Sequence, residues 1–243
     1  MQYFDAHIHL LDLCNLNQEN FNHGNTSFLA SCHSKEDIDF ADKLISQGWQ
    51  IVKSFGIHPW NLDYGQIPYL ENLIQQRQIN AIGEFGLDYY KPQKEPTEKQ
   101  KYFFELQLEL AAYNNLPAIF HLRKSLQDFF GYTKELRKLP AIILHSYSGT
   151  AEEANYLLKS NINAFFSFGT PIINENKKGQ NALEKIPTEH ILLETDAPYQ
   201  PVKNEAFTTI GKIADIYIKA AEIKKTEPEK LAQIIIKTKE KLF

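Results

Sequence analysis

The chain has 243 residues, of which 43% are hydrophobic and 23% charged, as in an ordinary soluble globular protein. Its net charge of −4 argues against a protein that coats nucleic acid by broad phosphate neutralisation, but not against an enzyme that grips a few phosphates. Cys14 and Cys32 are the only cysteines, too few for a disulfide framework, so a reducing compartment is expected.

The N-terminal sequence MQYFDAHIHL lacks the cationic start and apolar run of a signal peptide. No stretch approaches the roughly 18 consecutive apolar residues that a membrane span needs. We therefore expect a cytoplasmic protein with no membrane association and no obligate protein partner. The length fits a single barrel domain over residues 1–243, since one α/β barrel takes about 250 residues.

Short apolar runs recur along the chain, and each is followed by a more polar stretch. They are rich in β-branched and aromatic residues and almost continuously hydrophobic, which is typical of strands buried on both faces of a parallel sheet. The predicted strands are residues 2–7, 27–32, 51–56, 81–84, 117–121, 141–145, 164–167 and 191–196.

Helical patterns lie between these runs, and the clearest spans residues 97–115, between Pro96 and Pro117. The alternation predicts right-handed crossovers and a parallel sheet, and eight candidate strands suggest a (β/α)8 TIM-type barrel. The Asn-rich segment 11–25 is only weakly periodic, so we expect the first helix to be reduced or absent. The other predicted helices are residues 67–78, 126–138, 151–159, 208–221 and 227–242.

Six ionisable side chains of the metal-ligand type stand at the ends of five predicted strands. Because the carboxyl ends of parallel strands open on one face of a barrel, we expect these side chains to converge at one mouth. The imidazoles of the first strand are two residues apart, so they project to the same side and can hold a cation between them. The set comprises His7, His9, Glu84, His121, His145 and Asp196.

Imidazole nitrogen suits zinc and other first-row ions, and carboxylate oxygen extends the range to manganese and magnesium. Glu84 has two oxygens and can bridge two cations about 3.5–4 Å apart, which would clamp the attacking and leaving oxygens and acidify a water. Taken singly, His145 could be an ordinary buried histidine, and Glu84 or Asp196 a helix cap or salt-bridge partner. The joint pattern favours a site for two divalent metal ions (Mg, Mn or Zn).

Further residues are candidates for substrate contact. His58 follows the third strand and is predicted to reach the mouth, with a turn residue fixed by Pro59 as the alternative. Arg123 lies two residues past the fifth-strand histidine and is predicted to bind a substrate phosphate, with a surface ion pair as the alternative. Asp88 is expected to orient a ligand histidine or to cap a loop. The remaining histidines are expected at the surface and the tryptophans in packing: His23, His33 and His190, and Trp49 and Trp60.

Seven motifs run through nearly the whole chain in a fixed order. They are FDAHIHL, GIHPW, IGEFGLDYY, QKYFFELQLELAAYNNLPAIFHLR, LHSYSGT, FSFG and LLETDAPY. By these motifs the chain resembles the TatD-type metal-dependent hydrolases, the TatD-related deoxyribonucleases of the amidohydrolase superfamily. The resemblance implies hydrolysis of phosphodiester bonds in DNA, the expected substrate, with magnesium, manganese or zinc.

The resemblance also implies roles for the six ligands. Glu84 would bridge the ions, and Asp196 would accept a proton from the nucleophilic water, so both are expected to be catalytic. One ion would be held by His7, His9, Glu84 and Asp196, and the other by Glu84, His121 and His145.

The chain departs from the family pattern where substrate would bind. Ser146 and Tyr147 stand where a Cys-Phe pair is common, and the segment PVKNEA at residues 201–206 replaces a stretch that often contains arginine. A hydrolase of an amide, a lactone or a small phosphoester on the same scaffold therefore stays open as the alternative. A non-enzymatic metal-binding barrel ranks last, because it predicts the loss of a ligand and all six are present.

Overall fold

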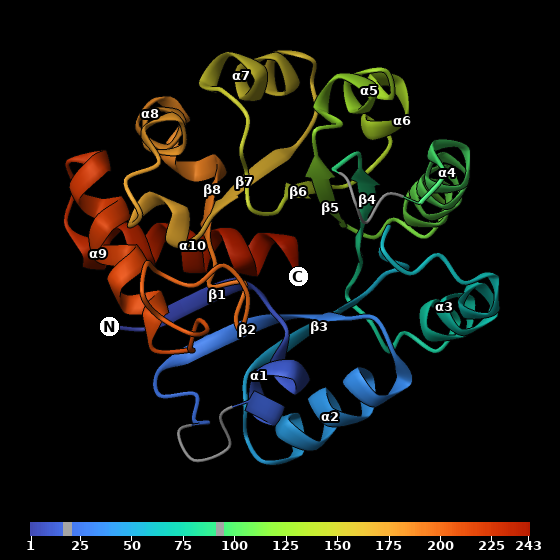
Figure 1. The fold of residues 1–243 in the computed structure, drawn as a ribbon, viewed down its shortest axis with the longest axis horizontal. Helices are drawn as coiled ribbons and strands as arrows, with labels where there is room; N and C mark the ends of the chain where they lie inside the picture. Colours follow the sequence, from blue (N-terminus) through green and yellow to red (C-terminus); the bar gives the residue numbers. More distant parts are fainter. Residues whose placement is uncertain (17–20, 91–94) are drawn as a thin grey trace.

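A computed structural model describes residues 1–16, 21–90 and 95–243 (Figure 1). Eight parallel strands, hydrogen-bonded in sequence order, curl into a nearly closed barrel of the predicted TIM type. They are β1 Tyr3–Ile8, β2 Thr26–Cys32, β3 Ile51–Phe55, β4 Ala81–Asp88, β5 Ala118–Arg123, β6 Ile142–Leu144, β7 Ala164–Phe168 and β8 Ile191–Leu193. Every residue of β2, β4, β6, β7 and β8 is buried, as strands inside a ring of helices should be.

The helices surround this barrel on its outer side (Figure 1). The first of them is only Leu10–Leu16, so the predicted reduction of the first helix is confirmed, although residues 17–20 of the Asn-rich segment lie outside the described residues. The others are α2 Lys35–Ser46, α3 Ile67–Gln75, α4 Thr97–Tyr113, α5 Leu126–Phe130, α6 Thr133–Leu136, α7 Ala151–Lys159, α8 Lys177–Lys185, α9 Lys212–Lys224 and α10 Pro228–Leu242, with short 3-10 turns η2 Tyr64–Gln66, η3 Thr170–Ile172 and η4 Thr188–His190.

Two helix predictions need correction, and two helices were missed. The single helix expected over residues 126–138 is two short helices, α5 and α6, separated at Gly131, and α9 begins at Lys212 rather than at residue 208. Helices α2 and α8 were not predicted. A capping box begins α2, because the Ser34 hydroxyl accepts from the Asp37 backbone N–H while the Asp37 carboxylate accepts from the Ser34 N–H.

Strands β1 and β8 meet at the ring's closing edge through the segments that carry ligands. The Asp196 N–H donates to the His7 carbonyl at 2.9 Å, and the His9 N–H donates to the Ala197 carbonyl at 2.9 Å. Buried Asp5 of β1 adds a second tie, accepting from the backbone N–H of Thr195 at 2.9 Å and from its hydroxyl at 2.6 Å. The first and last strands thus fix each other's position at the mouth.

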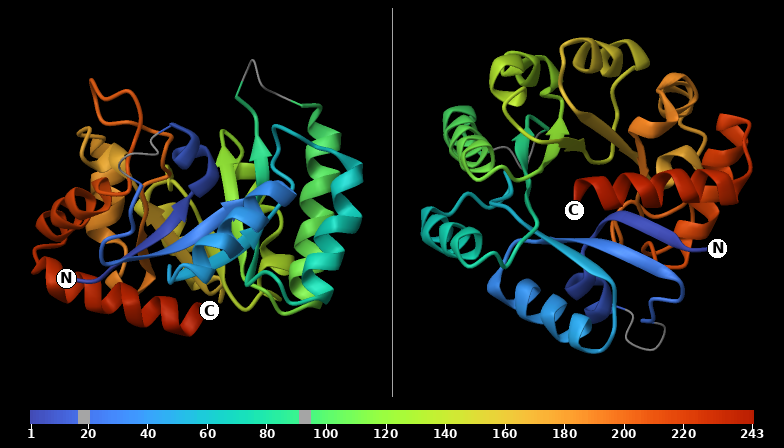
Figure 2. Two further views of the ribbon diagram at one scale, coloured as in Figure 1. Left: turned by 90° about the horizontal axis from the view of Figure 1, so that it is seen from below. Right: turned by 180° about the vertical axis from the view of Figure 1, so that it is seen from behind.

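The two ends of the barrel differ. The strands point toward the mouth, and α10 lies across the opposite end (Figure 2, left) and packs against β1 and β8. Buried Tyr217 of α9 holds the start of β1, since its hydroxyl donates to the Phe4 carbonyl at 3.0 Å and accepts from the Phe4 N–H at 3.2 Å. Across the described residues, no helix is long and apolar enough to cross a bilayer.

Candidate metal centre

Glu84 of β4 lies at the centre of a histidine cluster at the barrel mouth. Its side chain is 3% exposed, and six of the chain's eight histidines place a ring nitrogen within 3.9 Å of its oxygens. Because these histidines follow or end β1, β2, β3, β5 and β6, the barrel brings them together although they span residues 7 to 145. All six sequence-predicted ligands reach this cluster.

The two oxygens of Glu84 face different sets of side chains. Oε2 lies 3.1 Å from His7 Nε2 and 3.9 Å from His9 Nε2, and these imidazoles also face Asp196 Oδ1, at 3.9 Å and 3.4 Å. Oε1 lies 2.7 Å from His121 Nδ1 and 2.9 Å from His145 Nε2. The two oxygens of this carboxylate therefore contact different imidazoles, although His7, His145 and Asp196 also place ligand atoms within 4.8 Å of one another.

The charges of this cluster are strongly coupled. Burial alone would raise the pKa of Glu84, but the neighbouring imidazoles, His145 foremost, outweigh burial and hold that pKa well below its usual range. Burial opposes protonation of His145 as well, yet Glu84 and Glu194 raise its pKa well above the ordinary histidine value. Burial and the charge of His145 lower the pKa of His7. Both shifts favour a negative charge on Glu84 beside a positive charge on His145.

The donor set fits divalent cations. Three groups have ligand atoms that all lie within 4.8 Å of one another: His7, His145 and Asp196; His7, His9 and Glu84; and His58, Glu84 and His121. Imidazoles outnumber carboxylates, which suits zinc better than magnesium or manganese, the ions that prefer oxygen ligands. Because metal binds the deprotonated ring nitrogen, loading would displace the proton held between His145 and Glu84.

Residues around the ligands hold them in place. The Asp88 carboxylate Oδ2 lies 3.1 Å from His121 Nε2 and accepts from the Trp60 indole N–H at 2.7 Å, so Asp88 faces a ligand histidine as predicted. Trp60 is 44% exposed, and its ring meets His121 edge-on at 5.9 Å between centroids. The indole is thus fixed at the mouth by a hydrogen bond rather than packed in the core.

Two buried glutamines of α4 anchor the strand ends beside the cluster. Gln107 accepts from the Ile57 N–H at 2.7 Å and donates to the Ile57 carbonyl at 3.1 Å. Gln100 does the same for Asp88, accepting from its N–H at 2.8 Å and donating to its carbonyl at 3.0 Å. Seven residues apart on one helix face, these side chains fix the backbone next to His58 and at Asp88 itself.

Two hydrogen-bonding residues at the barrel mouth, Glu194 and Gln200, were not predicted from the sequence. Glu194 is fully buried, places Oε1 3.3 Å from His145 Nδ1 and accepts from the Ser146 N–H at 2.7 Å. Gln200 donates to Asp196 Oδ2 at 2.6 Å and to the Ser146 hydroxyl at 2.7 Å. A signal for Glu194 was present, because it directly follows the apolar run of β8 just as the predicted ligands follow theirs.

His58 and His33 both lie in the cluster, which agrees with the expectation for His58 and overturns that for His33. His58 Nε2 lies 3.4 Å from Glu84 Oε1. The surface assignment of His33 was wrong: its side chain is only 25% exposed, its Nε2 lies 3.8 Å from Glu84 Oε2 and its Nδ1 is 2.9 Å from the Gly56 carbonyl. Burial and the nearby His58 and His9 lower its pKa to about 3, so its imidazole is neutral.

The other singled-out residues lie outside the cluster. Arg123 is exposed, and its guanidinium stacks on the Tyr90 ring at 3.7 Å from the centroid. His190 is half-buried with Nδ1 2.8 Å from the Ala164 carbonyl, and His23 meets the ring of buried Trp49 at 5.0 Å between centroids. Trp49 therefore has the packing role that was expected.

The chain is similar to known proteins along its whole length. The profile of the family described as TatD related DNase matches residues 4–243. A Bacillus subtilis (strain 168) protein named uncharacterized metal-dependent hydrolase YabD is 31% identical, over 86% of this chain and 79% of the relative. The 3'-5' ssDNA/RNA exonuclease TatD of Escherichia coli (strain K12) is also 31% identical, over 74% of this chain and 70% of the relative.

A solved structure agrees on the fold. The crystal structure of the TatD homologue YjjV from Escherichia coli K12 superposes with a TM-score of 0.85 at 22% identity, covering 99% of this chain and 97% of that one. The family match spans the barrel and every strand end that carries a ligand. The chain therefore belongs to the TatD-related DNase family of metal-dependent hydrolases.

Proposed function

We propose that this hydrolase cleaves phosphodiester bonds in DNA, with two divalent cations held on either side of Glu84. The observation that carries the proposal is the partition of the Glu84 oxygens, because Oε2 faces His7 at 3.1 Å while Oε1 faces His121 at 2.7 Å. One cation would be held by His7, His9, Glu84 and Asp196, and the other by Glu84, His121 and His145. The name of one relative, the 3'-5' ssDNA/RNA exonuclease TatD of Escherichia coli, is consistent with this substrate class.

Asp196, Gln200 and Asp88 would have different roles in the reaction. When bound, the cations would supply positive charge for the phosphodiester oxygens and lower the pKa of a water. Asp196 would accept the proton of that water; His9 and the other imidazoles lower its pKa despite burial, which keeps the carboxylate ionised. Gln200 fixes the second Asp196 oxygen through a hydrogen bond of 2.6 Å, so Asp196 keeps one orientation. Asp88 orients His121 from the opposite side.

The test is cleavage of an end-labelled single-stranded oligodeoxynucleotide after chelation and re-addition of magnesium, manganese or zinc. The wild-type protein is expected to shorten the labelled oligonucleotide only when metal is added. Glu84→Gln keeps the shape but removes the shared charge, and should reduce cleavage at least about 100-fold, more than the loss of an outer partner costs. Glu189→Gln removes an exposed charge at the other end of the barrel and should cleave normally.

Two results would contradict the proposal. Cleavage by Glu84→Gln at the wild-type rate would exclude the bridging role of this carboxylate. If the wild-type protein binds about two metal ions but cleaves no oligonucleotide with any of them, the substrate is instead an amide, a lactone or a small phosphoester.

A further inference from the structure

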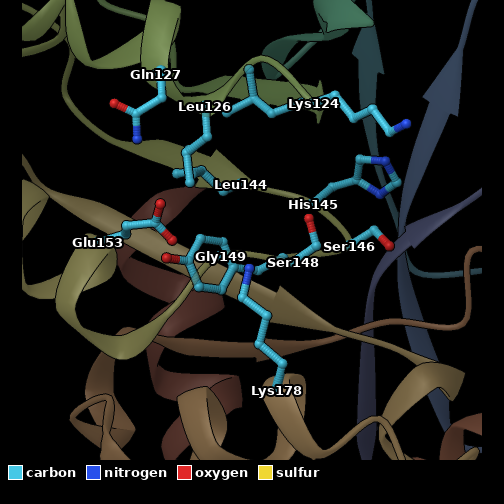
Figure 3. Close-up of a pocket in the computed structure, with 12 residues that line it drawn as sticks. Lys124, Leu126, Gln127, Leu144, His145, Ser146, Ser148, Gly149, Glu153 and Lys178 are labelled. Carbon is cyan, nitrogen blue, oxygen red and sulfur yellow. The ribbon is translucent and has the colours of Figure 1, made fainter. Parts of the chain in front are cut away.

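A pocket of about 370 Å³ opens beside the metal centre, with His145 in its wall (Figure 3). Its lining comes from three stretches: the end of β5 through the start of α5, the end of β6 through the first turn of α7, and the start of α8. None of the roles assigned above uses this space. In volume it lies at the low end of the roughly 300–1,000 Å³ typical of small-ligand sites.

Two lysines border the pocket from different elements. Lys178 reaches in from α8 with its Nζ toward the middle of the pocket, and Lys124 lies along the side where His145 is found (Figure 3). Among the described residues, neither lysine forms an ion pair with a carboxylate. The Lys124 ammonium lies 4.8 Å from the Tyr90 ring centroid.

The one carboxylate in the lining is already engaged. Glu153 accepts from the Thr150 backbone N–H at 2.6 Å, as the second half of the capping box that begins α7. With two lysines against this single carboxylate, the lining carries a net positive charge even before any cation is bound nearby. A substrate group attracted here is therefore an anion.

The rest of the lining is suited to a nucleoside. Leu126 and Leu144 form an apolar side of the pocket, and Ser146 and Ser148 line it elsewhere (Figure 3). Leu122 adds to the apolar lining. A flat base can lie against the apolar side while the sugar and phosphate meet hydroxyls and ammonium groups. A volume of about 370 Å³ suits a single nucleotide.

We propose that this pocket binds the nucleotide next to the scissile phosphodiester, with Lys178 and Lys124 contacting its backbone phosphate. The inference rests on the proposed function, and it assigns the residues that grip the strand. It also explains how an acidic chain binds a polyanion: the positive charge is placed locally, beside His145, rather than spread over the surface. Arg123, the phosphate ligand expected from the sequence, does not line this pocket and stacks on Tyr90.

The test is binding of a fluorescein-labelled, phosphorothioate-linked hexadeoxythymidylate by anisotropy, from 50 to 200 mM salt. For single strands each phosphate contact contributes about 0.7 to the slope of log affinity against log salt, so losing one contact weakens binding roughly fivefold at about 0.1 M salt. Lys178→Gln and Lys124→Gln should each show that loss of affinity and of slope. Lys177→Gln is the matched control, because Lys177 is the exposed neighbour on α8 that does not line the pocket.

A second variant tests the cavity itself. Ser148 is exposed and lines the pocket, so Ser148→Trp should fill it without disturbing the core and should weaken oligonucleotide binding more than either lysine change. Affinity and salt slopes of the lysine variants equal to those of Lys177→Gln would overturn the inference. Hydrolysis of bis(p-nitrophenyl) phosphate by the wild type, with metal, reports the proposed phosphodiesterase separately. If it cleaves this compound while the lysine variants bind like Lys177→Gln, only the pocket assignment fails.

Discussion

Replacing Gln107 with leucine should destabilise the protein and loosen one side of the metal centre. The Gln107 side chain is wholly buried and satisfies both backbone groups of Ile57, itself 1% exposed, at 2.7 Å and 3.1 Å. Leucine has similar volume but no polar atoms, so the substitution leaves a buried N–H and a buried C=O without partners. At about 1–3 kcal/mol for each orphaned group, the free energy of unfolding should fall by about 2–6 kcal/mol.

The assay is urea-induced unfolding in the presence of a chelator, so that metal binding does not contribute to the measured stability. Glu109→Leu on the exposed side of α4 is the control and should change the free energy of unfolding by no more than about 0.5 kcal/mol. Because Ile57 precedes His58, Gln107→Leu should also reduce the rate of metal-dependent hydrolysis. A Gln107→Leu protein as stable as Glu109→Leu would refute the view that this helix anchors the strand ends.

Three further outcomes follow from the contacts described above. Asp88→Asn should lower the affinity for Zn²⁺ or Mn²⁺ about 10–100-fold in a calorimetric titration, because Asp88 orients His121; an unchanged affinity would remove that role. Tyr217→Phe should lower the free energy of unfolding by about 2–6 kcal/mol, since both backbone groups of Phe4 lose the tyrosine hydroxyl, whereas Tyr113→Phe, at a side chain 90% exposed, should not. Chelation should lower the free energy of unfolding of the metal-loaded protein by about 2.7 kcal/mol, if the ion had been present at 100 times its dissociation constant. Identical thermal transitions with and without chelator would contradict a metal site in the folded state.

The barrel and the candidate ligands could be predicted because each candidate lies at or within a few residues of the end of a buried apolar run. A polar residue in that position is visible in the sequence, and the parallel topology then brings all such positions to one face. Glu84 was placed at the end of its strand, although β4 continues to Asp88. The extension was hidden because Gly86 and Asp88 interrupt the hydrophobic run, while in the structure every residue of β4 is buried.

Other features depended on tertiary contacts that no local pattern contains. His33 also follows a buried strand, but the position of its ring depends on a contact with the Gly56 carbonyl, which lies just after the neighbouring strand β3. Helix α2 has a capping box at Ser34 and Asp37 that could have revealed it. The two lysines of the pocket come from segments more than 50 positions apart and share no motif, so only the folded chain shows them together.

The tie between the first and last strands has a consequence for biosynthesis. Asp5 and Thr195 are separated by 190 positions, and the ligand Asp196 follows immediately. A ribosome adds residues in order, at about 5–20 each second, so a growing chain holds most of its histidines for many seconds before their last carboxylate exists. Metal acquired before that point would meet an open ring that lacks Asp196 and its closing hydrogen bonds. Completion of the centre is therefore a late event in the synthesis of each new chain, because it waits for Asp196, which follows the last strand of the barrel.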